Sequence, residues 1–237
     1  MLSIVVPALD EAANLERLLP DLVARCAGDE VIVVDGGSAD ATAEVVRRFP
    51  AVVLVHSPRG RARQMNAGAR VARGDALLFL HADTALPAGA RALIERAVAG
   101  GAAGGGFEVR FDDPRWIFAL GSRIVNLRTR LLRAPLGDQA QFVTREAFLA
   151  LGGFHEWPIL EDLDLMRRLR KHGRVEVLRA PATTAARRFV EGGITRTIAI
   201  NWSIWALYLV GVPPARLARL YPPRSKRSCG ATSGDAT

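Results

Sequence analysis

The first 85 residues alternate between short apolar runs and segments whose apolar residues recur at helical spacing, and few folds accept this pattern. The apolar runs lie at 3–7, 31–34, 52–55 and 76–80, and the helical segments between them at about 12–27, 40–49 and 63–73. A strand–helix succession of this kind folds into a parallel sheet with helices on both faces. We therefore expect an α/β domain with a mostly parallel sheet.

Acidic residues follow three of these four predicted strands, as Asp10, Asp35 and Asp83. Ligands of open α/β sheets bind beyond the carboxyl ends of the strands, so the three carboxylates predict a nucleotide site. The residues after the first strand include no glycine, and no Walker loop is present, which argues against a phosphate-cradling backbone loop. A divalent metal on Asp83, with His81 two residues before it, is the alternative means of holding phosphates. By itself, Asp83 is equally well explained as a turn residue before a helix that opens at Pro87.

The second half of the predicted domain is less regular. A glycine-rich run at 100–106 is either a loop or a close approach of backbone to a ligand, and the pattern favours the loop. Further predicted elements are a strand at 107–111, a basic helix at 115–133, a short strand near 142, a short helix at 145–151 and a last strand at 175–178.

Glu161, Asp162 and Asp164 lie in the first turn of a helix whose apolar face continues to Leu169. The helix dipole stabilises acids at this place, which is a purely structural explanation. It does not explain why three acids gather beside a Gly152-Gly153-Phe154 turn. A second carboxylate site is therefore expected here.

The net charge of +8 arises after residue 110. Residues 1–110 hold 12 basic and 13 acidic side chains, residues 111–190 hold 14 and 9, and residues 191–237 hold 6 and 2. This excess suits phosphate or an anionic membrane surface. It does not suit nucleic acid, since the basic residues are not interleaved with stacking aromatics.

The last part of the chain leaves alternatives open. Arg187 and Arg188 either clamp phosphate or face solvent. The segment 194–212 is too polar for a membrane span and is either a helix packed on the domain or an interfacial helix. Residues 224–237 are expected to be disordered. Two cysteines make no disulfide framework, and the N-terminus carries no signal peptide, so a cytoplasmic location is expected, with peripheral contact at the inner face of the cell membrane left open.

These pieces together resemble the family 2 glycosyltransferases over residues 2 to about 190, and most closely a short bacterial subgroup. The matching segments are Ile4–Glu11, Val34–Thr42, Arg59–Ala69, His81-Ala82-Asp83 and Gly152-Gly153-Phe154 with Glu161-Asp162. The resemblance implies a GT-A fold, a nucleoside-diphosphate sugar donor, Mn²⁺ or Mg²⁺, and inversion in a hexosyltransferase-type reaction. It also implies a division into a catalytic domain (1–190, with a nucleotide-sugar half to 110 and an acceptor half from 111), a helical extension (191–223) and the tail.

The same resemblance assigns roles to individual positions. The donor-binding positions are Pro7, Asp10, Glu11, Asp35, Gly36, Arg59, Arg63, Asn66, His81, Ala82 and Asp83. Asp83 is implied as the metal ligand and Asp162 as the catalytic base, with Glu161 orienting the loop or the acceptor. Gln139, Gln141 and Trp157 are implied on the acceptor-side loop, and Arg187 and Arg188 as phosphate candidates. Two departures from the family pattern stand out: His81 replaces the first aspartate of Asp-x-Asp, and no histidine after Asp162 clearly completes a metal shell.

The sequence therefore predicts transfer of a sugar, from a UDP-sugar ahead of a GDP-sugar, to an acceptor that it does not identify and for which a lipid-like molecule is one option. Three competing functions stay open. A sugar-phosphate nucleotidyltransferase would need a glycine- and arginine-containing loop after the first strand, which the sequence lacks. A non-catalytic nucleotide-sugar-binding module would lack the second carboxylate site, and a membrane scaffold would not need residues 1–190.

Overall fold

A computed structural model describes residues 1–26 and 28–220, and confirms the α/β architecture. The strands are β1 (Leu2–Ala8), β2 (Glu30–Asp35), β3 (Val52–His56), β4 (Ala76–Phe79), β5 (Thr84–Ala85), β6 (Ala102–Phe111), β7 (Gln141–Thr144) and β8 (Arg174–Thr184). The α-helices are α1 (Ala12–Arg25), α2 (Thr42–Arg47), α3 (Arg61–Val71), α4 (Ala90–Ala99), α5 (Trp116–Leu132), α6 (Arg145–Ala150), α7 (Glu161–His172), α8 (Arg187–Gly192), α9 (Ile194–Leu209) and α10 (Pro214–Leu217). Two 3₁₀ turns, η1 (Gly137–Gln139) and η2 (Ala218–Leu220), complete the described part. The predicted tail, 224–237, lies outside it.

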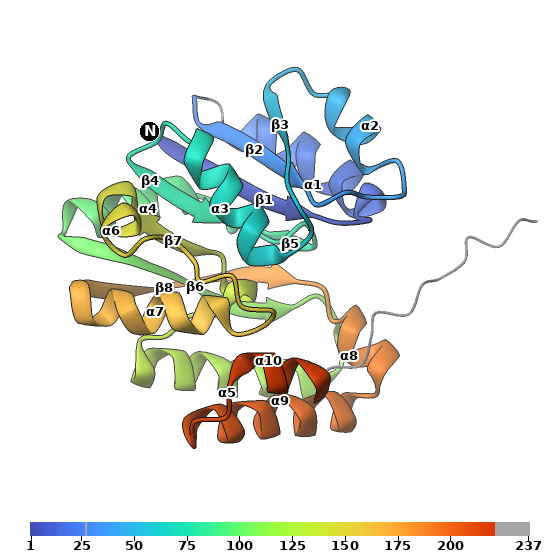
Figure 1. Ribbon diagram of the computed structural model, residues 1–237, viewed down its shortest axis with the longest axis vertical. Coiled ribbons are helices and arrows are strands. Elements are labelled where there is room, and N and C mark those ends of the chain that lie inside the picture. Colours follow the sequence, from blue (N-terminus) through green and yellow to red (C-terminus); the bar gives the residue numbers. More distant parts are fainter. Residues whose placement is uncertain (27, 221–237) are drawn as a thin grey trace, which may run out of the picture.

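All eight strands belong to one sheet in the order β3-β2-β1-β4-β7-β6-β8-β5 (Figure 1). The β1, β2, β3 and β4 strands pair in parallel, as the alternating pattern predicts. β7 then pairs antiparallel with both β4 and β6, while β6 and β8 are parallel. Strands from before and after residue 110 thus share one sheet.

Helices cover both faces of the sheet, and an apolar cluster lies on each face. Strands such as β1 contribute to both clusters, because their successive side chains point to opposite sides. Ile4 and Val6 of β1 belong to one apolar cluster, whereas Val5 between them belongs to the other. All three are fully buried, and each such side chain stabilises the fold by roughly 1.5–3 kcal/mol. The first cluster includes buried residues of α1, α2 and α4, and the second those of α3, α6 and α7.

The glycine-rich run 100–106 was expected to be a loop, and this is wrong for all but Gly100 and Gly101, which lie in a turn. Residues 102–106 form the first half of β6, in the middle of the sheet. A Cβ on Gly105 would lie 1.9 Å from the carbonyl oxygen of Glu176, and one on Gly104 would lie 2.5 Å from that of Phe142. The glycines therefore allow neighbouring strand backbones to approach closely, a role that composition alone does not distinguish from a loop.

The predicted helix at 194–212 is present as α9, with one side against the domain. Ile204 is buried, and Trp205 and Tyr208 pack against the second apolar cluster. Trp202, in contrast, is 58% exposed. None of the described helices combines the length and apolar content needed to cross a membrane.

Candidate active site

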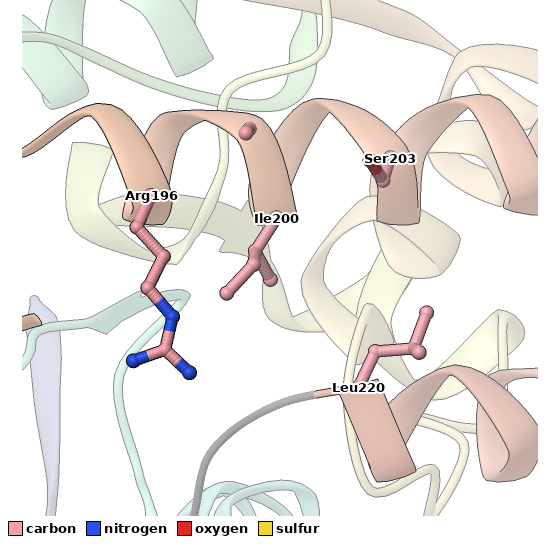
Figure 2. Close-up of a pocket in the computed structure, with 5 residues that line it drawn as sticks. Arg196, Ile200, Ser203 and Leu220 are labelled. Carbon is pink, nitrogen blue, oxygen red and sulfur yellow. The ribbon is translucent and has the colours of Figure 1, made fainter.

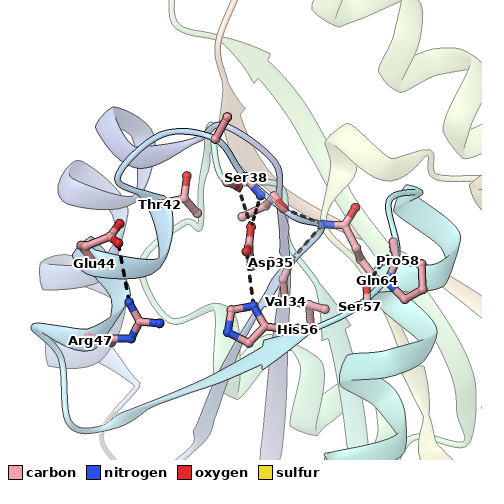
Figure 3. A network of polar contacts seen from close by, with 12 residues as sticks. Val34, Asp35, Ser38, Thr42, Glu44, Arg47, His56, Ser57, Pro58 and Gln64 are labelled. Atoms are coloured by element: carbon pink, nitrogen blue, oxygen red, sulfur yellow. Dashed lines mark hydrogen bonds and ion pairs between the residues drawn. The ribbon is translucent and has the colours of Figure 1, made fainter.

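Asp35 is a buried carboxylate at the sheet edge where β1 and β2 end. It lies opposite Ala8 in the β1–β2 register and is only 4% exposed. Its Oδ1 accepts hydrogen bonds from the backbone and the hydroxyl of Ser38, at 3.0 and 2.5 Å. Its Oδ2 lies 3.3 Å from Nδ1 of His56, the last residue of β3 (Figure 3). Sequence analysis missed His56, although it follows an apolar run just as the acids do.

The loop after β1 is fixed to the loop after β2. Asp10 adopts a left-handed backbone conformation (φ 55°), and its Oδ1 accepts a 2.7 Å hydrogen bond from the backbone of Ala39. Its own N–H donates to the Ser38 hydroxyl at 2.9 Å, and the Glu11 N–H donates to the Thr42 hydroxyl at 2.9 Å. The exposed Asp10 carboxylate and the buried Asp35 carboxylate thus border the same pair of loops.

Gln64, on α3, is hydrogen-bonded to the strand ends at this edge. Its amide nitrogen donates to the carbonyl oxygens of Ala8 (2.6 Å) and Val34 (2.9 Å), where β1 and β2 end (Figure 3). A Cβ on the buried Gly36 would lie 2.9 Å from this amide, so the position requires glycine. Pro7, one residue from the end of β1, is partly buried.

The α3 helix also holds the segment that leads into α7. Nε of Arg61 pairs with Oε1 of the buried Glu161. The Arg63 guanidinium pairs with Glu156 at 2.7 Å. Of the predicted donor-binding positions in this region, Arg59 is exposed in the loop before α3, whereas Arg63 and Asn66 on α3 contact other parts of the protein.

Asn66, on α3, forms two hydrogen bonds through its side-chain amide with the backbone of Phe154. Its Oδ1 accepts from the Phe154 N–H at 2.9 Å, and its Nδ2 donates to the Phe154 carbonyl at 2.8 Å. A Cβ on Gly153 would lie 2.8 Å from the same Oδ1, so this turn requires glycine for space as well as for its positive φ of 76°. The Gly-Gly-Phe turn and α3 therefore form one unit.

His81 and Asp162 meet at Gly137. A Cβ on this glycine would lie 2.8 Å from Nε2 of His81 and 3.1 Å from Oδ2 of Asp162. The Gly137 N–H donates to the same Oδ2 at 2.8 Å, and the Leu163 N–H donates to Oδ1 at 2.7 Å. His81, two residues after β4, and Asp162, at the start of α7, thus both lie beside one small backbone position.

Asp138 is a site residue that sequence analysis missed. Its Oδ1 is shielded from solvent and has no hydrogen-bond partner among the described residues. Burial, partly offset by Arg128 and reinforced by the negative charge of Asp162, raises the pKa of Asp138 from 3.8 to about 6. Burial also lowers the pKa of Arg128. A lone acid before a short strand gives no signal of this environment, which arises only when η1 packs against α5 and α7.

Gln139 and Gln141 are buried and bonded within the protein. The Gln139 amide donates to the Phe107 carbonyl at 3.0 Å and accepts from Thr129 at 3.0 Å. The Gln141 amide donates to the carbonyls of Pro135 and Asp162, at 2.7 and 3.1 Å. Both amides therefore hold in shape the loop that was predicted to lie on the acceptor side.

Trp157 is partly exposed in the loop before α7. Its ring lies 5.5 Å from that of His155 and 6.5 Å from that of Tyr208 on α9. His155 in turn contacts Asp164 at 2.9 Å. Trp157 thus joins the predicted acceptor side to the C-terminal helix.

Asp83 lies in the exposed turn between β4 and β5. Its carbonyl accepts from the Ala185 N–H at 3.2 Å, which places the start of α8 beside it. Arg187, at that start, is exposed, and the side chain of Arg188 lies outside the described residues. Ala82, between His81 and Asp83, is buried.

Within residues 1–26 and 28–220, no group of three or more His, Cys, Asp or Glu residues is arranged to hold a metal ion. Asp83, exposed and at a strand end, suits a cation that arrives with a diphosphate, since Mg²⁺ is commonly held by one or two carboxylates plus substrate phosphates. The donor set therefore fits a metal shared with substrate, and not a metal held by protein alone.

Two hollows of the described surface lie away from these residues. One, of about 280 Å³, is lined by Arg196, Ala199, Ile200 and Ser203 of α9 and by Leu220 (Figure 2). The other, of about 240 Å³, lies between the start of β6, α6 and His172. Neither contains a predicted site residue.

Residues 3–149 match the family described as Glycosyl transferase family 2. A PGL/p-HBAD biosynthesis glycosyltransferase of Mycobacterium tuberculosis is 37% identical over 93 residues, which are 36% of this chain and 36% of that protein. An undecaprenyl-phosphate 4-deoxy-4-formamido-L-arabinose transferase of Pseudomonas aeruginosa is 34% identical over 139 residues, or 54% of this chain and 41% of that protein. The chain thus spans between about a third and two fifths of the length of these relatives.

Solved structures of this fold are also similar. A mannosyltransferase of Pyrobaculum calidifontis in complex with GDP-Man and Mn²⁺ has a TM-score of 0.65 and 22% identity, covering 92% of this chain and 68% of that chain. S. aureus TarS 1–349 in complex with UDP has a TM-score of 0.61 and 18% identity, covering 92% and 69%. Together with the sheet order, these similarities confirm the GT-A fold that the motifs predict.

Proposed function

Because the chain belongs to glycosyl transferase family 2, we propose that it transfers a sugar from a nucleoside-diphosphate sugar to an acceptor hydroxyl. One observation carries the proposal. His81, from the nucleotide half, and Asp162, from the acceptor half, both lie beside Gly137, at 2.8 and 3.1 Å from the position that a Cβ on this glycine would take. A donor bound beyond β4 would therefore have a carboxylate within reach of its sugar.

The donor site is proposed at the ends of β1 and β2. Asp35 would accept a hydrogen bond from the base or ribose, with Asp10, Glu11 and the Gly36 backbone bordering the same loops. Two solved relatives of this fold are complexes with UDP or with GDP-Man, so the fold accepts either base. We propose a UDP-sugar, since recognition here rests on side chains at strand ends and not on a glycine-rich loop.

A divalent cation, Mn²⁺ or Mg²⁺, would be held by Asp83, and His81 is a second candidate ligand whose imidazole lies beside Gly137. When bound, such a cation supplies positive charge that offsets the charge of the departing diphosphate. Arginine side chains near the same edge, Arg59 and Arg187, are exposed and can add to this charge.

Asp162 is proposed as the general base of an inverting transfer. Its two oxygens accept backbone hydrogen bonds from Gly137 and Leu163, which fix the carboxylate in position while each oxygen retains acceptor capacity. It would take the proton of the acceptor hydroxyl as that oxygen bonds to the anomeric carbon and the bond to the diphosphate breaks. Glu161, bonded to Arg61, orients the loop.

The acceptor is proposed to be lipid-like. One relative carries undecaprenyl phosphate in its name, and Trp157 links the acceptor side to α9. A location at the inner face of the cell membrane is proposed on the same basis. The competing nucleotidyltransferase, binding-module and scaffold hypotheses receive no specific support from the geometry.

The test is sugar transfer by Asp162→Asn, assayed by mass spectrometry with a panel of nucleotide sugars and membrane lipid extract. We expect transfer to fall by roughly two to four powers of ten, the usual range for a general base, while nucleotide binding is retained. Asp164→Asn, two residues away and bonded to Arg168 at 2.8 Å, is the control for a changed helix start. Parent-like transfer by Asp162→Asn would exclude this residue, and loss with Glu161→Gln alone would transfer the role to Glu161.

A further inference from the structure

The α5 helix has its polar side turned inward. Among its buried positions are Ser122 and Thr129, and the Thr129 hydroxyl donates to the buried amide of Gln139 at 3.0 Å. The Asn126 amide bonds to the backbone of Val109 in both directions, at 2.8 and 3.0 Å. Polar side chains therefore attach α5 to β6 and η1.

The outer side of α5 is apolar. Trp116, Leu120, Ile124, Leu127 and Leu131 follow one another at intervals of three or four residues, so they form one stripe along the helix. All five are exposed, Trp116 and Leu131 to 74%. This is the reverse of the usual arrangement of a surface helix, and a contiguous apolar stripe marks a surface that contacts another apolar phase.

The α9 helix extends this surface. The Arg128 guanidinium of α5 lies 5.0 Å from the ring of Trp205, and Figure 1 shows α5 and α9 together at the end of the molecule opposite α2 and β3. Of the sixteen large apolar side chains exposed in the described part of the chain, six are on α5 and six lie between Val190 and Leu220. We define the α5/α9 face by its largest exposed members, namely Trp116, Leu120, Ile124, Leu127, Leu131, Ile198 and Trp202.

The charge of these segments is strongly positive. Residues 116–133 and 190–220 contain seven arginines and one acid, Glu191. Arg123, Arg133 and Arg196 are exposed. The neighbouring acid Glu108 forms an ion pair with Arg130, at 2.5 Å. A second copy of this chain on the same face would bring arginines against arginines, whereas an anionic lipid surface offers both phosphates and acyl chains.

We propose that the α5/α9 face docks on the surface of an anionic lipid bilayer, with α5 as its principal contact. Leucine and isoleucine side chains would enter the acyl boundary, the indoles of Trp116 and Trp202 would lie at headgroup level, and the arginines would reach lipid phosphates. Docking does not depend on the proposed sugar transfer. Vesicle binding is measured without donor, so its failure would leave the proposed enzymatic activity intact.

The experiment is flotation of the full chain with vesicles of phosphatidylcholine alone or with 30% phosphatidylglycerol. We expect binding to the anionic vesicles, weaker binding at high salt, and a drop of roughly tenfold or more for the double variant Ile124→Gln/Leu127→Gln. The control is Leu149→Gln, which replaces an equally exposed leucine (65%) on α6, and should bind as the parent does.

Tryptophan fluorescence is a second measurement of docking, and the parent protein can be tested in it without any substitution. Brominated lipid should quench the tryptophan emission of the parent, and Trp116→Phe should lose a large part of that quenching while binding is retained. Three results would overturn the proposal: no flotation with anionic vesicles at low salt, parent-like binding by the double variant with unchanged circular dichroism, or a parent dimer that the double variant converts to monomer without any lipid binding.

Discussion

Replacing Asp138 by asparagine should stabilise the protein at neutral and alkaline pH. The folded protein raises the pKa of Asp138 from 3.8 to about 6, because burial disfavours the ionised carboxylate. The unfolded chain releases this proton at lower pH than the folded chain, so the parent loses stability as pH rises from about 4 through 6. At 1.36 kcal/mol per pH unit the total loss is about 3 kcal/mol, and it is complete above pH 7.

The assay is urea unfolding of parent and Asp138→Asn at pH 4.5 and pH 8. From the same two pKa values, the variant should be more stable by roughly 1 kcal/mol at pH 4.5 and roughly 3 kcal/mol at pH 8. Asp21→Asn is the control, because Asp21 is half exposed and paired with Arg25 one turn away, and its replacement should change stability by less than about 1 kcal/mol at either pH. If Asp138→Asn is instead less stable than the parent at pH 8, the pairing of the ionised Asp138 carboxylate with Arg128 outweighs the cost of its burial, and the pKa of Asp138 is not raised.

Three further predictions concern the donor site and the sheet. Asp83→Ala should remove the gain in nucleoside-diphosphate affinity that Mn²⁺ gives the parent in calorimetry, and equal parent affinity with and without the metal would refute the role of Asp83. UDP should raise the thermal midpoint more than GDP does, and Asp35→Asn should weaken UDP binding about tenfold to a hundredfold, as expected for a lost charged hydrogen bond; a larger shift with GDP would reverse the base preference. Gly105→Ala should destabilise the protein by at least about 1–3 kcal/mol in urea unfolding, because its Cβ would collide with the Glu176 carbonyl; an unchanged midpoint would mean that β6 and β8 separate freely.

The alternating half of the fold could be predicted from the sequence because its signals are local. Each strand from β1 to β4 is a short apolar run that ends in a polar residue or is followed by one within two residues, and the helices between them bury apolar residues at helical spacing. The glycine-rich part of β6 could not be predicted as a strand from the sequence, because glycine is equally typical of loops. It forms a strand because its backbone packs closely against the Phe142 and Glu176 carbonyls, which lie 38 residues after Gly104 and 71 residues after Gly105.

The site divides in the same way. Asp35 and Asp162 were predicted from their places after a strand and at a helix start, and these places hold in the structure. Asp138 was not predicted as a site residue, because the charges that surround it, those of Arg128 and Asp162, come from two other elements of the fold. The outward apolar stripe of α5 was also missed: helical periodicity reveals a stripe but not which way it faces.

The contacts of α3 have a consequence for how substitutions combine. Three side chains of this helix contact the segment that leads into α7. Arg61 pairs with Glu161, Arg63 pairs with Glu156, and Asn66 is hydrogen-bonded to Phe154. These segments are 88 to 100 residues apart in the chain, yet residues in direct contact do not contribute independently to stability. A double-mutant cycle of Arg61→Leu with Glu161→Gln should therefore depart from additivity, and the two stretches should exchange their amide protons as one cooperative unit.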